Sequence, residues 1–319
     1  MTRPDVLLTA PIIPSVVEKL DARYALHRLW EQADQTGFLE AVGPRIRGMA
    51  TNTLFGKVDD ALLDRLPALE IIASFGVGYD NVDVAAAMRN GVVVTNTPGV
   101  LDDEVADLTV GLLLATLRRI PQADRFVRDG GWQNGAFPLS PTLRGRQVGI
   151  VGLGNIGKAV ARRLTGFDVV VRYHGRTPQP DVAYDFHATV VELARASDVL
   201  IILVPGGAGT THLIDGDVLA ALGPNGVLIN VSRGSVVDEP ALIHALESET
   251  ILAAGLDVYA HEPKVPDRLK AMANVVLLPH IGSGSHYTRA AMGDLLVDNL
   301  AAWFATGQAM TPVPESVQG

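Results

Sequence analysis

Short, continuous apolar runs alternate along this chain with longer segments of helical periodicity, and this alternation limits the fold more than any other feature. The runs include "IIASF", "QVGIVGL", "DVLIILVP" and "NVVLLPH", and helical patterns such as "NIGKAVARRL" and "EPALIHALES" lie between such runs. Unbroken runs of Val, Ile and Leu are typical of strands buried on both faces. Alternation of strands with helices favours parallel sheets with right-handed crossovers, so we expect a doubly wound α/β architecture.

The length and an internal similarity predict two such sheets. A chain of 319 residues is long enough for two domains. The segments "LPALEIIASFGVGYDNVD" and "ALGPNGVLINVSRGSVVD" share one order: a helix end, a strand, a turn with glycine, and then an aspartate. This weak similarity favours two related α/β halves over one large sheet.

Composition excludes several classes of function. The chain has no cysteine, which excludes disulfides, thiolate metal sites and a cysteine nucleophile, and we expect no metal. The net charge of −9 argues against sequence-independent binding of nucleic acid or anionic lipid. No run approaches the roughly 18 apolar residues of a membrane helix, and prolines interrupt the first apolar run. We expect a soluble, cytoplasmic protein.

Residues 102–130 form the longest helical pattern. Pro121 is expected to kink or end its first half, and Gly130-Gly131 its second half. The stretch "VADLTVGLLLATL" is apolar on more than one face, which predicts burial between domains or in a subunit interface. The last segment, "TRAAMGDLLVDNLAAWFATG", reads as an amphipathic helix that packs back on the first half.

A glycine loop follows the apolar run at residues 147–151. Its pattern, Gly152-Leu153-Gly154-Asn155-Ile156-Gly157, stands between a strand and a helix, as in dinucleotide-binding folds. There the first glycine makes a tight turn, the second lets the backbone approach a pyrophosphate, and the third lets the helix pack on the strand. The phosphates lie at the positive end of the helix. A glycine turn without a ligand is the alternative.

The turn after the next run, "VVVRYHGRT", bears on which dinucleotide binds. A carboxylate in this turn accepts hydrogen bonds from the adenosine ribose and repels a 2′-phosphate. Here the turn has Gly175, Arg176 and Thr177 instead. Because a guanidinium suits a phosphate dianion, the turn favours NADP(H), with NAD(H) as the second cofactor. The alternative is an exposed arginine that contacts nothing.

Three polar residues stand at ends of expected strands in the second half: Arg233, Glu262 and His280. Ligands of doubly wound sheets bind beyond the carboxyl ends of the strands. A histidine beside a carboxylate keeps its proton more readily, and an arginine can hold a carboxylate or polarise a carbonyl. From spacing alone the pattern only hints at catalysis, since a histidine at a strand end is more often structural.

Taken together, these motifs resemble those of the D-isomer-specific 2-hydroxyacid dehydrogenases. "SFGVGYDNVD", "VADLTVGLLL", "VGLGNIGKAVARR", "NVSRGSVVDEPAL", "GLDVYAHEP" and "LPHIGS" occur in the family's order and cover nearly the whole chain. Within the family the chain looks most like the glyoxylate/hydroxypyruvate and hydroxyphenylpyruvate reductases, whose ribose-site turns also lack the acidic residue.

The resemblance implies two Rossmann-like domains with the active site in the cleft between them. The substrate-binding domain is formed by both chain ends, residues 1–98 and 287–319, and the dinucleotide-binding domain is residues 99–286. It also implies a homodimer through the cofactor domains, with the segment from Asp102 as the arm. It leaves open whether Trp132 reaches the neighbouring subunit's site.

The resemblance also implies the site residues. Arg233 orients the substrate, His280 is the acid/base, and Glu262 pairs with His280. Val77 and Gly78 hold the substrate carboxylate through backbone N–H groups, Asp257 meets the nicotinamide carboxamide, and His280 also borders the cofactor. Leu54, in the loop "ATNTLFG", and Ser283 are further candidates for substrate contact. The remaining cofactor contacts are expected from Thr109, Gly152, Leu153, Gly154, Asn155, Ile156, Gly157, Arg176, Thr177, Val204, Pro205, Thr210, Val231, Ser232 and Gly282.

The expected activity is NADPH-dependent reduction of small 2-keto acids, such as glyoxylate and hydroxypyruvate, to D-2-hydroxy acids. His261 and His286 are expected to lie outside the catalytic set. The alternatives are an NAD-dependent dehydrogenase of another D-2-hydroxy acid or of hydroxyphenylpyruvate, an enzyme acting on phosphite, and a dinucleotide-sensing, corepressor-type binding protein with the same fold. The sequence does not fix the acyl group of the substrate or the physiological direction.

Overall fold

The computed structural model describes residues 3–52 and 56–317. The chain divides into two compact units. Unit 1 comprises Met1–Leu101 and Ser285–Gly319, and unit 2 comprises Asp102–Gly284. The assignment of substrate binding to residues 1–98 with 287–319, and of dinucleotide binding to residues 99–286, stays a prediction.

Unit 1 is built on a five-stranded parallel sheet with the order β2-β1-β3-β4-β5. The strands, in that order, are Ala25–Arg28, Asp5–Leu8, Ile46–Asn52, Ile71–Phe75 and Val93–Thr95. The order reverses between β1 and β3, which makes the sheet doubly wound. The three inner strands are almost wholly buried, as their continuous apolar or small side chains require.

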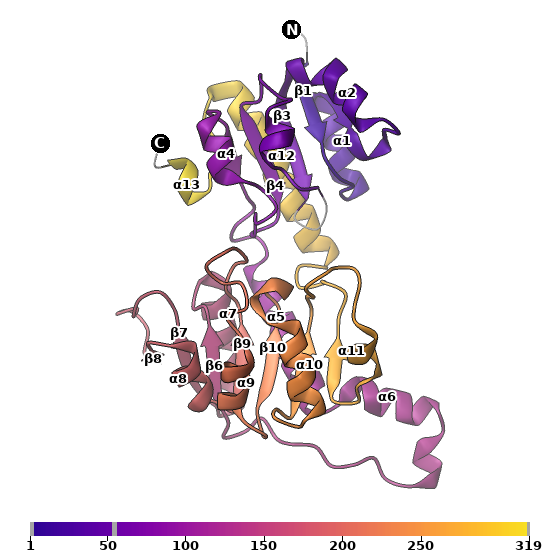
Figure 1. The fold of residues 1–319 in the computed structure, drawn as a ribbon, viewed down its shortest axis with the longest axis vertical. Coiled ribbons are helices and arrows are strands. Elements are labelled where there is room, and N and C mark those ends of the chain that lie inside the picture. Colours follow the sequence, from indigo (N-terminus) through magenta and orange to yellow (C-terminus); the bar gives the residue numbers. More distant parts are fainter. Residues whose placement is uncertain (1–2, 53–55, 318–319) are drawn as a thin grey trace. The chain divides into compact units, whose positions relative to one another are not determined.

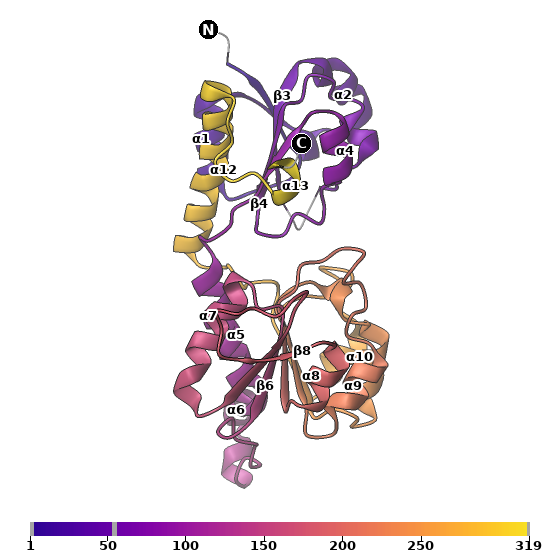
Figure 2. The same ribbon diagram turned by 90° about the vertical axis from the view of Figure 1, so that its left-hand side faces the viewer.

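Helices cover both faces of this sheet (Figures 1 and 2). On one face α12 packs on β4 and on α1, and on the other face lie α2 and α4. The helices of unit 1 are α1 Pro14–Arg23, α2 Gln35–Val42, α3 Asp60–Leu63, α4 Val84–Arg89, α12 His286–Thr306 and α13 Pro314–Val317. The expectation that the last long helix packs on the first half of the chain is confirmed.

Unit 2 contains a seven-stranded parallel sheet with the order β12-β11-β10-β9-β6-β7-β8. The strands, in that order, are Val275–Leu277, Ala253–Leu256, Val227–Asn230, Val199–Ile202, Gln147–Val151, Val170–His174 and Asp185–His187. The order reverses between β6 and β9, and the carboxyl ends of these two strands mark the usual ligand position of such a sheet.

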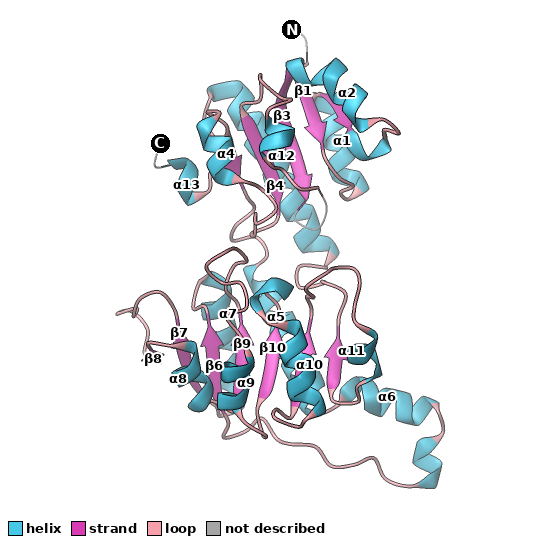
Figure 3. Ribbon diagram, viewed as in Figure 1, coloured by secondary structure: helices cyan, strands magenta, loops and turns pink. Residues whose placement is uncertain are grey.

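Two apolar cores lie on the two faces of this sheet. One packs against α5 and α7, and the other against α8, α9 and α10, as Figure 2 shows. The helices of unit 2 are α5 Asp102–Leu117, α6 Ile120–Arg128, α7 Asn155–Leu164, α8 Val190–Arg195, α9 Gly216–Leu222, α10 Glu239–Glu247 and α11 Asp267–Ala271. The prediction of two doubly wound α/β sheets is therefore confirmed, and Figure 3 shows the strands enclosed by helices in each unit.

The long helical pattern consists of two helices, α5 and α6. The break falls at Arg119, whose backbone is left-handed with φ of 54°, and Pro121 stands in the first turn of α6. Burial in α5 extends to several faces, as expected, and its buried residues are Val105, Ala106, Thr109, Val110, Leu112, Leu113, Thr116 and Leu117. By contrast, α6 has no buried residue within this chain.

Three strands were not among the expected apolar runs: β2, β3 and β8. Two of them, β2 and β8, lie at sheet edges, and their sequences "ALHR" and "DFH" are mixed because one side of each strand has no neighbouring strand. The third, β3, is central, but its buried residues are small; Gly48 packs so closely under Phe304 that an added Cβ would lie 3.0 Å from the ring. In the described part of the chain, no helix is both long and apolar enough to cross a membrane.

Candidate active site

The carboxyl ends of the parallel strands of unit 2 bring most of the expected site residues to one edge of the sheet. Because all seven strands point the same way, the residues that directly follow them share that edge. Five strands contribute: Gly152 follows β6, Val204 comes after β9, Arg233 after β10, Asp257 after β11 and His280 after β12.

The glycine loop between β6 and α7 has the geometry that its sequence predicts. Gly152 has a φ of 100°, and an added Cβ on Gly157 would lie 2.4 Å from the Gly152 carbonyl oxygen, so glycine is required at both positions. An added Cβ on Gly154 would meet no described atom within 4 Å. Gly154 is also the N-cap of the ten-residue α7, whose first N–H groups lack helical partners. The loop therefore offers backbone donors beside open space, which fits a pyrophosphate.

The turn after β7 presents two polar side chains to solvent. Arg176 and Thr177 are both exposed, and neither makes a hydrogen bond or ion pair with any other described residue. The nearest atom to an added Cβ on Gly175 is the Thr177 carbonyl oxygen at 3.9 Å, so the protein itself does not demand glycine here. The turn holds a cation and a hydroxyl that the fold does not use.

Two further residues, which the sequence did not single out, fix this turn to the glycine loop. The hydroxyl of the buried Tyr173 accepts a hydrogen bond from the N–H of Gln179 at 2.7 Å. The Gln179 side chain in turn donates to the carbonyl oxygen of Leu153 at 2.8 Å. Because these contacts tie the residues on both sides of Arg176, they limit how far the turn can move from the glycine loop.

Glu262 and His280 form a hydrogen-bonded pair. Oε2 of Glu262 lies 2.7 Å from Nδ1 of His280, and the two side chains are only 25% and 22% exposed. His280 has a left-handed backbone, with φ of 55°, and its N–H donates to the carbonyl oxygen of Asp257. Such a backbone is uncommon for a residue with a side chain, and its recurrence at functional sites makes it a useful marker. The Nε2 edge of the ring has no hydrogen-bond partner among the described residues.

The surroundings keep Glu262 ionised. Burial, the largest single effect, raises the pKa of this carboxyl group, while the hydrogen bond and positive charge of His280 lower it. The N–H of Tyr259, which donates to Oε1 at 3.1 Å, and the charge of Arg233 act in the same direction. The net pKa of Glu262 lies below its ordinary value, so a carboxylate faces His280 across the neutral range.

Asp257 holds the segment that carries His280. Its side chain is 1% exposed, Oδ1 accepts from the N–H of Ile281 at 2.8 Å, and Oδ2 accepts from the N–H of Gly282 at 2.8 Å. Burial raises the pKa of Asp257 above its ordinary value, although these two N–H groups and the charge of His280 oppose the shift. The role expected from the resemblance, contact with a nicotinamide carboxamide, stays a prediction; the structure adds an anchoring role that the sequence did not reveal.

Arg233 is placed by the turn after β10. Its Nη1 donates to the Ser232 carbonyl oxygen at 2.8 Å, and its own carbonyl oxygen accepts from the side chain of Asn230 at 3.0 Å. The next residue, Gly234, lies so close to Tyr259 that an added Cβ would be 1.8 Å from the carbonyl carbon. This close packing joins the Arg233 turn to the segment that leads to Glu262, and the charge of Arg233 acts on Glu262.

Most of the other expected cofactor residues lie along the same edge of unit 2, and Thr109 lies within α5. The hydroxyl groups of three of them donate within the protein: Thr109 to Val105, Thr210 to Pro205 and Ser232 to Asn230, at 2.6–2.8 Å. Thr109 is fully buried. Val204 and Val231 are half-buried at the ends of β9 and β10, Leu153, Pro205 and Gly282 belong to the loops at this edge, and Asn155 and Ile156 begin α7. Contact of these residues with a dinucleotide stays a prediction.

Unit 1 carries the residues expected to hold a carboxylate. The N–H groups of Val77 and Gly78, after the end of β4, have no hydrogen-bond acceptor among the described residues, and both residues are half-buried. Leu54 lies outside the described residues, and Ser283, half-buried, follows Gly282 in unit 2. His261 and His286, which we expected to lie outside the catalytic set, are both exposed.

Comparison with known proteins identifies the family. Residues 110–282 match the model of the D-isomer specific 2-hydroxyacid dehydrogenase, NAD binding domain. The chain is 47% identical over 308 residues to a hydroxyphenylpyruvate reductase of Plectranthus scutellarioides and 45% identical over 308 residues to glyoxylate/hydroxypyruvate reductase A of Arabidopsis thaliana, with 97% of this chain and 98% of each relative covered.

Among solved structures, the chain resembles an NADPH-dependent glyoxylate/hydroxypyruvate reductase from Sinorhizobium meliloti in complex with NADP and malonate. The sequences are 52% identical, the TM-score is 0.94, and the alignment covers 99% of this chain and 98% of that one. The fold, the glycine loop and these similarities together show that the chain belongs to the D-isomer-specific 2-hydroxyacid dehydrogenase family.

Proposed function

We propose that this protein reduces small 2-keto acids, such as glyoxylate and hydroxypyruvate, to D-2-hydroxy acids with NADPH. The observation that carries the proposal is the 2.7 Å contact between Nδ1 of His280 and the Glu262 carboxylate, which leaves Nε2 as the edge for a substrate. Related chains are named reductases of these keto acids, which supports the same reaction here.

Residues of this chain donate the proton and stabilise the negative charge that the reduction requires. A nicotinamide bound to unit 2 would supply the hydride for the keto carbon. Protonated His280 donates the Nε2 proton to the keto oxygen, while the Arg233 guanidinium stabilises the negative charge that develops there. Glu262 compensates the positive charge of the imidazolium ring. Reduction of the keto acid uses protonated His280, whereas oxidation of the hydroxy acid uses the neutral ring as the base.

Substrate binding uses the carboxylate that all 2-keto acids share. We assign the N–H groups of Val77 and Gly78 to this carboxylate, because two successive unpartnered N–H groups form an anion-binding site. Arg233, Ser283 and Leu54 are the other candidates for substrate contact. Substrate binding by unit 1 follows from this assignment, and dinucleotide binding by unit 2 follows from its glycine loop.

NADP(H) is the preferred cofactor in this proposal, with NAD(H) as a weaker one. The open space at Gly154 and the exposed N-terminus of α7 suit the pyrophosphate of either dinucleotide, and the preference for NADP(H) rests on the turn in which Arg176 and Thr177 replace a carboxylate. The guanidinium of Arg176 and the hydroxyl of Thr177 would bind the 2′-phosphate, and Asp257 the carboxamide.

A homodimer completes the proposal. The segment from α6 to residue 139 exposes large apolar side chains: Ile120 is 52% exposed, Val127 54%, Trp132 69% and Leu139 99%. So much apolar surface in one segment marks an interaction site, and a second copy of the chain is the partner that the family resemblance implies. A cytoplasmic location, expected from the sequence, belongs to the same proposal.

A panel of 2-keto acids assayed with NADPH and with NADH tests this function. We expect turnover of glyoxylate and hydroxypyruvate with NADPH, and slower turnover of both with NADH. The panel should include hydroxyphenylpyruvate, because a relative that is 47% identical is named for that substrate. Absence of turnover with every 2-keto acid, under conditions in which NADPH binds, would contradict the proposal.

A further inference from the structure

We propose that Asn96 is a positioning residue for the substrate carboxylate, acting through the peptide bond between Val77 and Gly78. This inference rests on the proposed function, since it takes the carboxylate of a 2-keto acid as the ligand of these N–H groups. Asn96 follows β5 and Val77 follows β4, the neighbouring parallel strand, so both lie at the carboxyl edge of the unit 1 sheet.

The contact itself is a hydrogen bond from the Asn96 side chain. Its Nδ2 donates to the carbonyl oxygen of Val77 at 2.8 Å. Of the two ends of the Asn96 amide, only the nitrogen can serve here, since the partner is a carbonyl oxygen, which accepts but cannot donate. Asn96 is 9% exposed, so water competes little for this carbonyl.

Peptide geometry transmits the effect to Gly78. The bond between Val77 and Gly78 is trans, and in a planar trans peptide the C=O and the N–H point in opposite directions. Holding the Val77 oxygen towards Asn96 therefore aims the Gly78 N–H away from Asn96. That N–H and the N–H of Val77 both lack an acceptor among the described residues. Asn96 thus sets the direction of a donor that a carboxylate is expected to use.

Asn96 is held in turn by the C-terminal part of the chain. Its carbonyl oxygen accepts from Oγ1 of Thr311 at 2.6 Å, and its N–H donates to the Thr311 carbonyl oxygen at 3.3 Å. Thr311 is fixed by Asn299, a fully buried residue of α12, whose side chain donates to Thr311 Oγ1 and accepts from the Thr311 N–H, each at 2.9 Å. This network leaves the Asn96 backbone little freedom to move. Its side chain can therefore hold the Val77 carbonyl oxygen in one direction.

The variant Asn96→Leu removes the donor while keeping a side chain of similar size without charge. With the NADPH-saturated enzyme, we expect the dissociation constant of malonate, measured by calorimetry, and the KM of glyoxylate to rise roughly two- to tenfold, the range of a neutral hydrogen bond. Binding of NADPH should not change, because the nucleotide contacts proposed above are in unit 2.

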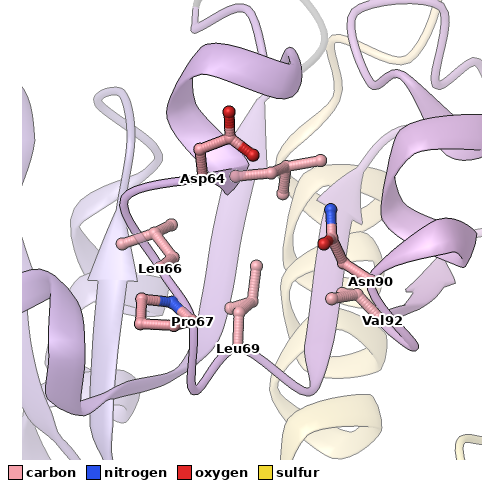
Figure 4. A pocket seen from close by; sticks show the side chains of 7 residues that line it. Asp64, Leu66, Pro67, Leu69, Asn90 and Val92 are labelled. Carbon is pink, nitrogen blue, oxygen red and sulfur yellow. The ribbon is translucent and has the colours of Figure 1, made fainter.

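The matched control is Asn90→Leu. Asn90, the C-cap of α4 in the same unit, also donates its side-chain N–H to a carbonyl oxygen, that of Ala86 at 3.1 Å. Figure 4 shows it in the wall of a small pocket with Leu66, Leu69 and Val92, a setting with no proposed substrate contact. This variant should bind malonate and reduce glyoxylate as wild type does.

A second substrate separates positioning from general damage. The methyl ester of glyoxylate keeps the carbonyl but lacks the charge, so Asn96→Leu should affect its reduction far less than that of glyoxylate. An Asn96→Leu enzyme that melts cooperatively and binds malonate as tightly as wild type overturns the inference. An equal loss for acid and ester overturns it as well.

Two further outcomes are distinguishable. If Asn96→Leu does not fold, Thr311→Val, which removes the Oγ1 contacts to Asn96 and Asn299, should weaken malonate binding in the same direction, and an unchanged malonate affinity contradicts the inference. If wild type reduces no 2-keto acid, the proposed function fails. The malonate titration still decides the role of Asn96, because it needs no turnover.

Discussion

Nδ1 of His280 lies 2.7 Å from the Glu262 carboxylate, and this contact sets which edge of the imidazole can face a substrate. His280 is held at two points: its ring Nδ1 donates to the Glu262 carboxylate, and its backbone N–H donates to the Asp257 carbonyl oxygen. A histidine held in this way exchanges a proton only through Nε2, which is the requirement for a directed acid or base.

The lowered pKa of Glu262 predicts an effect on stability. A carboxyl group whose folded-state pKa lies below its unfolded value stabilises the fold at pH values above the unfolded pKa, and this contribution disappears as pH falls through the folded pKa. The variant Glu262→Gln should therefore be less stable than wild type at neutral pH, and the difference should shrink under acidic conditions. Denaturant unfolding across this pH range measures it; a difference that grows as pH falls contradicts the assignment.

Arg176→Ala tests the basis of the cofactor preference. If the guanidinium binds the 2′-phosphate, its removal should raise the KM of NADPH roughly ten- to hundredfold, as expected for a lost bond between two charged groups, and leave the KM of NADH nearly unchanged. Steady-state assays with both cofactors give the ratio. Equal effects on the two cofactors, or a wild-type preference for NADH, would show that the turn with Arg176 does not bind the 2′-phosphate.

Gln179→Leu should raise the ratio of the KM of NADPH to the KM of NADH by a smaller amount than Arg176→Ala does. The lost hydrogen bond to the Leu153 carbonyl oxygen loosens the turn without removing Arg176, so we expect a roughly two- to tenfold rise in the KM of NADPH relative to NADH. Gln32→Leu is the control, because Gln32 makes the same kind of bond, to the Arg28 carbonyl oxygen, in unit 1. A ratio that stays at the wild-type value removes Gln179 from this role.

The exposed apolar segment predicts assembly. Light scattering at micromolar concentration should give the mass of two chains, and Val127→Glu, which places a charge on α6 at a residue that is 54% exposed, should shift the mass towards one chain. Glu18→Gln, on α1 of unit 1, is a charge-changing control that should leave the mass unchanged. A wild-type monomer would contradict the dimer.

The sequence predicted well those features that depend on neighbouring residues. The strand expected at residues 147–151 is observed at Gln147–Val151, and the loop and helix after it follow the pattern of glycines because each glycine satisfies a local backbone requirement. The break near Pro121 has the same local origin. Edge strands such as β8 were not predicted because they lack a continuous apolar run. The central strand β3 was not predicted because its buried residues are small.

Contacts between distant residues had no signal in the sequence. Asn96 and Thr311 are 215 positions apart, and Gln179 and Leu153 are 26 positions apart. Neither pair is linked by periodicity or by a motif, since a polar side chain near a strand end has many potential partners until the fold brings one of them close. The anchoring role of Asp257 likewise depends on Ile281 and Gly282 coming next to β11.

The most direct measurement of the central claim is the turnover of His280→Ala with hydroxypyruvate and saturating NADPH. If His280 donates the proton, turnover should fall by about 10² to 10⁴, the usual contribution of a positioned acid, while the dissociation constant of NADPH stays close to that of wild type. A His280→Ala enzyme that reduces hydroxypyruvate at nearly the wild-type rate would contradict the account, and the proton donor would have to be sought elsewhere.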